Sequence, residues 1–159
     1  MLNVLFLDTG NTTESLIAES VLRACGHGRF RAWSAGCLSS EAANTSVLTF
    51  LRERDLPVDG LRSKGLHELT RLEGPSFAFV ITLSEIAAMA AREHRFSGDP
   101  VIAHWHLDTD EDGREPSVWA IRDSFWVLSR RIKIFTSLPH GKTTRLVLEK
   151  RLHALENWQ

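Results

Sequence analysis

The segment from Val4 to Glu19 most constrains how this chain of 159 residues can fold. Its first four residues are apolar and predict a buried strand, which runs directly into a polar loop rich in Thr, Gly and Asn. Beyond the loop, apolar residues return at helical spacing: Leu16, Ile17, Val21 and Leu22. A strand, a polar loop and the start of a helix form an anion cradle, because the loop N–H groups and the helix dipole point at one spot. The segment therefore predicts an anion-binding loop over residues 8–15.

The rest of the chain continues the alternation of strands and helices. Apolar runs predict further strands at 30–35, 77–83 and 101–107, after a first strand at 3–7. Amphipathic spacing predicts helices at 13–24, 41–54, 66–72, 86–95, 118–138 and 142–158. This order indicates an α/β fold: a single-domain three-layer sandwich over residues 1–159, with a four-stranded parallel sheet flanked by helices. In such a fold the site is expected at the carboxyl ends of the strands.

Composition and charge exclude several classes of partner. The chain has 19 basic and 20 acidic residues and a net charge of −1, so nothing favours nucleic acid. No apolar run is long enough to span a bilayer, and the N-terminus lacks the features of a signal peptide. Cys25 and Cys37 do not form a disulfide framework or a CxxC pair. We therefore expect a cytoplasmic protein with no nucleic-acid or membrane partner and no cofactor.

The polar loop resembles that of the low-molecular-weight protein tyrosine phosphatases and the related thioredoxin-coupled arsenate reductases. Their loop runs Cys, two residues, Asn, two residues, Arg, Ser, and Asn11 and Ser15 stand at the matching positions. The run 9–12 is similar to the arsenate reductase version. The resemblance makes the following residues the equivalent of the anion loop: Asp8, Thr9, Gly10, Asn11, Thr12, Thr13, Glu14 and Ser15. The family's Cys falls on Asp8 and its Arg falls on Glu14.

Motifs outside the loop extend the resemblance to residues 1–138. They are Ser34-Ala35-Gly36 after the second strand, Arg62-Ser63-Lys64 before the third, the third strand itself at 80–83, and matches at 122–135 in the long helix. The resemblance thus implies a low-molecular-weight phosphatase-like fold with a family core at 1–138, and residues 139–159 form an added C-terminal helix.

The chemistry that the resemblance implies is transfer of a phosphoryl or arsenate group through a Cys thiolate, with an Arg that grips the oxyanion. An Asp-Pro loop supplies the general acid. Its Asp falls on Thr109, with Asp108 and Asp110 on either side. Ser84 stands near the third strand, where the reductases carry cysteine, and no Cys follows Cys37. We therefore predict no thiol relay and assign no catalytic residue.

Two interpretations of Asp8 and Glu14 stay open. In the first, both acids are non-catalytic. Asp8 then accepts the loop N–H groups in place of a phosphate, and Glu14 pairs with Asn11 as the third residue of a capping box. In the second, Asp8 is a nucleophile that forms an aspartyl-phosphate with help from Mg²⁺, or the two carboxylates work as acid and base.

The segment 104–113 offers a second candidate site. His104, His106, Asp108, Asp110 and Asp112 alternate, so an extended chain would place them on one face. The three Asp residues match the first positions of an EF-hand calcium loop. The bidentate Glu at the last position of such a loop is replaced here by Trp119, so that match fails. A divalent-metal site and a solvated acidic loop both fit this pattern.

These observations leave two classes of function. The favoured one is a catalytically disarmed pseudoenzyme of this family that binds or regulates a protein or small-molecule partner, with a homodimer as one candidate assembly. The alternative is an enzyme of altered chemistry that uses Asp8 and Glu14 for metal-assisted phosphoester hydrolysis or acid–base work. Trp119, Phe125 and Trp126 are interpreted as core or interface residues.

Overall fold

The computed structural model describes residues 1–38, 42–108, 115–139 and 145–157. Its four strands are β1 (Leu2–Asp8), β2 (Phe30–Gly36), β3 (Phe79–Thr82) and β4 (Val101–His104). They form one parallel sheet in the order β2-β1-β3-β4. In register, Asp8 pairs with Gly36 and Thr82 pairs with His104, so the carboxyl ends of all four strands meet at one edge.

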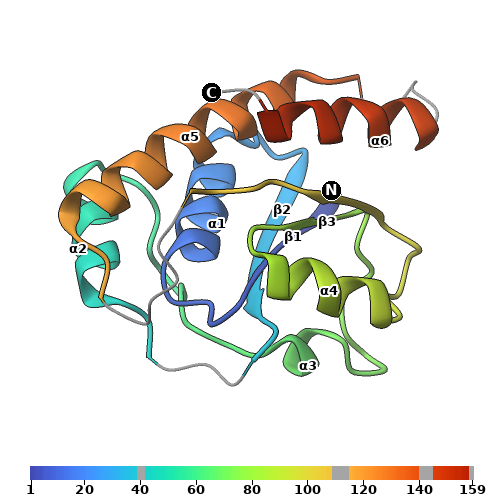
Figure 1. The fold of residues 1–159 in the computed structure, drawn as a ribbon, viewed down its shortest axis with the longest axis horizontal. Coiled ribbons are helices and arrows are strands. Elements are labelled where there is room, and N and C mark those ends of the chain that lie inside the picture. Colours follow the sequence, from blue (N-terminus) through green and yellow to red (C-terminus); the bar gives the residue numbers. More distant parts are fainter. Residues whose placement is uncertain (39–41, 109–114, 140–144, 158–159) are drawn as a thin grey trace.

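Helices cover both faces of this sheet (Figure 1). They are α1 (Glu14–Cys25), α2 (Thr45–Glu53), α3 (Leu66–Leu69), α4 (Glu85–Glu93), α5 (Val118–Ser137) and α6 (Arg145–Ala154), and a 3-10 turn, η1 (Leu155–Asn157), follows. On one face α1, α2, α5 and α6 pack in a cluster with Val4 and Phe6 of β1. On the other face α3 and α4 pack with Leu5 and Leu7. The alternation of buried side chains along β1 thus separates two apolar layers, and the predicted three-layer α/β fold is confirmed.

Several predicted boundaries were wrong by a few residues. The helix predicted at 41–54 begins only at Thr45, because the side chain of Asn44 accepts the N–H of Ser46 and caps the helix there. The strand predicted at 101–107 ends at His104, because β3 stops at Thr82 and the N–H of Trp105 makes the last ladder bond to the Thr82 carbonyl. The terminal helix predicted at 142–158 is described as α6 and η1.

Among the residues that the structure describes, no helix combines the length and the apolar character needed to cross a bilayer. Even α5, the longest of these helices at 20 residues, carries charged side chains along its length.

Candidate functional site

The loop between β1 and α1 lies at the carboxyl edge of the sheet, where the sequence places the site. Its backbone packs directly on the end of β2, since the N–H groups of Cys37 and Leu38 donate to the carbonyls of Asp8 and Thr9. A Cβ at Gly36 would lie 2.8 Å from the carbonyl carbon of Gly10 and 2.9 Å from the Thr9 oxygen. Only glycine allows this approach, which explains the glycine at the end of β2.

The Asp8 side chain points into the loop and binds its backbone. Its Oδ1 accepts the N–H of Asn11 at 2.6 Å, and its Oδ2 accepts the N–H of Ser15 at 3.0 Å. The carboxylate is buried, and so are both donor residues. These are the bonds expected of Asp8 if it replaces a bound anion. Since Ser15 is the second residue of α1, the same carboxylate also satisfies one of the free N–H groups at that helix end.

The predicted capping box of Asn11 and Glu14 is wrong. The residue before α1 is Thr13, whose side chain makes no capping bond, and Glu14 is the first helical residue rather than the third. Asn11 lies in the left-handed region, with φ at 55°, where its short polar side chain is tolerated. That side chain donates to the Ser15 hydroxyl at 2.7 Å and accepts the N–H of Lys64 at 2.9 Å. Asn11 therefore braces the loop, and Asp8 supplies the cap.

Buried charges surround the loop. Lys64 is buried, and its ammonium donates to the Arg62 carbonyl. Burial lowers the pKa of Lys64, while the nearby carboxylates of Glu19 and, more weakly, Asp8 act to raise it. Glu19 in turn accepts the Ser34 hydroxyl and pairs with Arg23 at 3.1 Å. The negative charge of Asp8 therefore sits in a partly compensated field.

Further polar contacts tie the loop to neighbouring strands. The Thr9 hydroxyl lies 2.9 Å from that of Ser84 after β3, and the Ser63 hydroxyl donates to the Gly10 carbonyl. Thr12 and Glu14 are half-buried. Sequence reasoning singled out the loop but missed the roles of Ser63, Lys64 and Ser84.

The second candidate site is only partly described. His104, His106 and Asp108 lie in the described part of the chain, whereas Thr109, Asp110 and Asp112 lie outside it. The ladder of β4 ends at His104, but burial still alternates after it: Trp105 and Leu107 are buried, whereas His106 and Asp108 are exposed. The predicted common face is therefore confirmed for His104, His106 and Asp108, the members that the structure describes. The two imidazole rings lie close, with centroids 6.3 Å apart. Glu85, at the start of α4, joins them, and the ligand atoms of these three residues lie within 4.8 Å of one another. Sequence analysis missed Glu85. The signal that could have found it is its position just after β3, at the edge of the sheet where the site is expected.

Comparisons with known proteins show the family and the fold of the chain. A model of the low molecular weight phosphotyrosine protein phosphatase family matches residues 3–110. Because that match spans more than half of the chain, the chain belongs to this family. A comparison with curated proteins found no match.

Solved structures show the same fold. An arsenate reductase from Archaeoglobus fulgidus is 22% identical, with a TM-score of 0.65, over 85% of this chain and 99% of that one. A low molecular weight protein tyrosine phosphatase from Streptococcus pyogenes is 16% identical, with a TM-score of 0.63, over 94% of this chain and 98% of that one. An arsenate reductase in its phosphate-binding state is 19% identical, with a TM-score of 0.64, over 86% of this chain and 98% of that one. At these identities the likeness concerns the fold.

Proposed function

We propose that this chain is a member of its family without the thiol chemistry, and that it works as a binding or regulatory protein. The observation that carries the proposal is the Asp8 carboxylate, which holds the N–H groups of Asn11 and Ser15. In the anion loop that the resemblance implies, backbone N–H groups of this kind would face the bound anion. An incoming phosphate would have to displace a buried carboxylate and would meet its negative charge.

The residue types at the two family positions support the same conclusion. The resemblance places the nucleophile at Asp8 and the anion-gripping Arg at Glu14, and both residues here are acids. Loss of a nucleophile or of an oxyanion donor costs about 10² to 10⁶ in rate. The remaining cradle therefore keeps its shape but not the groups that transfer a phosphoryl or arsenate group.

The alternative, an enzyme that uses Asp8 as nucleophile or base, receives less support. Each of the two carboxylate oxygens already accepts a backbone N–H, which fixes the direction of the carboxylate. Attack on phosphorus needs an oxygen that faces the substrate in line with the leaving group. Asp8 would have to attack from an oxygen that stays bonded to the loop backbone, in a direction that these bonds restrict.

Two measurements on the full chain test the proposal. We expect no hydrolysis of p-nitrophenyl phosphate and no thioredoxin-coupled reduction of arsenate, with or without added Mg²⁺. We also expect no heat of binding for phosphate or vanadate in calorimetry. A turnover within about a hundredfold of ~10 per second would contradict the proposal.

The Asp8→Asn variant separates the two functions. Turnover that needs Mg²⁺ and disappears in Asp8→Asn would establish the altered enzyme instead. Turnover that survives in Asp8→Asn would exclude Asp8 as the reacting group. Asp123→Asn is the matched control, because Asp123 lies exposed on α5, outside the loop.

A further inference from the structure

Three side chains from different elements converge at the carboxyl edge of β3 and β4. Glu85 comes from the first turn of α4, His104 ends β4, and His106 follows two residues later. We propose that these three residues form a binding site for a divalent transition-metal ion, with Zn²⁺ the best match to the donor set. The site is separate from the Asp8 loop, and neither Asp8 nor Glu14 supplies a ligand.

The spacing of the donor atoms suits a single ion. The Nε2 atom of His104 lies 3.2 Å from Oε1 of Glu85, and the Nδ1 atom of His106 lies 4.0 Å from the same oxygen. Zinc bonds of about 2.0–2.1 Å in a tetrahedron separate two ligand atoms by about 3.3 Å. Small rotations of the His106 and Glu85 side chains would bring their ligand atoms to this tetrahedral spacing. Glu85 is free to rotate in this way, because its side chain is 75% exposed.

The His104 ring is oriented so that one of its nitrogens, Nε2, can bind a metal ion. Its Nδ1 lies 2.8 Å from the hydroxyl of Thr82, the neighbouring residue on β3. Its Nε2 is buried and makes no hydrogen bond of good geometry, although the Glu85 carboxylate is close. A buried nitrogen without a hydrogen bond is costly in the absence of an ion, and metal coordination would satisfy it.

In His106, too, one ring nitrogen faces the proposed metal position and the other contacts a supporting side chain. Its Nδ1 faces Glu85, while its Nε2 lies 3.1 Å from Oδ1 of Asp108. Metal-binding histidines commonly hold their outer nitrogen against a carboxylate or another oxygen, which fixes the ring and raises its basicity. Thr82 and Asp108 therefore occupy the positions of such supporting groups.

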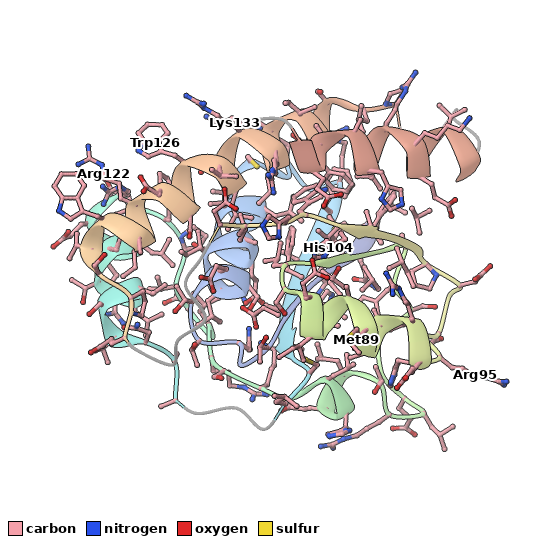
Figure 2. The ribbon with its side chains drawn as sticks, viewed as in Figure 1. Met89, Arg95, His104, Arg122, Trp126 and Lys133 are labelled. Carbon is pink, nitrogen blue, oxygen red and sulfur yellow. The ribbon has the colours of Figure 1, made fainter. Side chains whose placement is uncertain are left out.

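The surrounding structure fixes where the three ligands stand. The buried guanidinium of Arg131 donates to the carbonyl of His106 at 2.8 Å and to that of Glu156 at 2.7 Å. Between the two histidines, the buried indole of Trp105 donates to the Leu152 carbonyl. Ser84 caps α4 and so places Glu85. These contacts hold the backbone of all three ligand segments. Figure 2 shows His104 beside the start of α4.

Two imidazoles and one carboxylate are a donor set typical of zinc. Three protein ligands leave one tetrahedral position for water or for a ligand from a bound molecule. The site therefore adds an ion-dependent contact point to the carboxyl edge of the sheet. Its existence does not depend on whether the Asp8 loop has lost its chemistry, because the test uses neither phosphate nor turnover.

The test is calorimetric titration of the tag-free full chain with ZnCl₂, followed by the visible spectrum of the Co²⁺ form. We expect one ion per chain and an intense Co²⁺ spectrum typical of tetrahedral coordination. Glu85→Gln, His104→Gln and His106→Gln should each weaken zinc binding by at least about tenfold. Glu85→Gln is the decisive variant, because this exposed side chain can change without disturbing the core.

Matched variants control for general charge effects. Glu93→Gln, at the other end of α4, and His67→Gln, on α3, change exposed residues of the same types and should leave the affinity unchanged. Thr82→Val should weaken binding by about 10- to 100-fold while leaving all three ligands in place.

Two results would overturn the proposal. One is the absence of stoichiometric Zn²⁺ binding by the wild-type chain, checked to be folded by circular dichroism. The other is binding that persists unchanged in Glu85→Gln and His106→Gln. If Asp110→Asn with Asp112→Asn abolished binding while Glu85→Gln did not, the ion would belong to the acidic segment, and the assigned site would be wrong.

Discussion

At the scale of single residues, Asp8 shows how one carboxylate can bind the backbone of the loop that follows its strand. It satisfies two converging N–H groups and caps α1, which has no side-chain cap of its own. This part of the site was predictable, because an acid after the first strand, in front of a loop of N–H groups, has few other partners. The nearness of the buried Lys64, whose pKa the Asp8 carboxylate acts weakly to raise, was not predictable, because the two residues are 56 positions apart in the chain.

The isosteric change Asp8→Asn tests the structural role of this carboxylate. An amide can accept only one of the two N–H groups and turns its own NH₂ donors toward the other. We expect the free energy of unfolding to fall by about 1–3 kcal/mol, measured from the urea midpoint. The exposed Asp123→Asn should change it by less than about 0.5 kcal/mol. An equal, small effect of both variants would mean that Asp8 does not cap the loop.

At the scale of elements, the sequence identified the type and order of the strands and helices but placed several ends wrongly. Hydrophobic periodicity detects which face of an element is buried and not where its hydrogen bonds stop. The end of β4 depends on the length of its partner β3, and the start of α2 depends on the Asn44 cap. A linear pattern does not reveal the pairing of β3 with β4, whereas the Asn44 cap is a local signal that the hydrophobic periodicity alone does not use. Glu85 was missed for the first of these reasons, because it approaches His104 only once β3, which precedes α4, is paired with β4.

The loop 8–15 can itself be tested as an element by restoring the residues of the family pattern. Asp8→Cys removes the carboxylate from the N–H groups of Asn11 and Ser15, and Glu14→Arg adds a bidentate donor at the start of α1. We expect the double variant to bind phosphate or vanadate in calorimetry, and binding should return more readily than turnover of an aryl phosphate.

The control for this experiment is Asp8→Ser with Glu14→Gln, which removes both charges without adding the Arg. It should bind the anion at least about tenfold more weakly than the restored loop, a difference of about 1.4 kcal/mol. A folded double variant that ignores both anions would show that the loop does not have the shape of the family cradle.

At the scale of the whole molecule, the outer face of α5 is the surface on which we expect a protein partner to bind. Trp119 and Trp126 have exposed fractions of 71% and 52%, and the Arg122 guanidinium lies 5.7 Å from the Trp119 ring centroid. Figure 2 shows Arg122, Trp126 and Lys133 extending outward from this helix. Their exposure rules out the core interpretation of these two tryptophans, and the interface interpretation stays a prediction. Exposed aromatic and Arg side chains are enriched in protein interfaces.

The charge of this face decides between a second copy and a different partner. Arg122, Arg130 and Lys133 are exposed along it, against one exposed acid, Asp123. Two copies joined through this face would bring like charges together in a desolvated interface, which is costly. A partner with an acidic surface and an apolar pocket for a tryptophan is the better match.

We therefore expect the chain to remain a monomer of 17.9 kDa in light scattering after size exclusion, at low and at high salt. A dimer that Trp126→Ser dissociates, while the matched change Met89→Ser on exposed α4 does not, would instead make a second copy the occupant of this face.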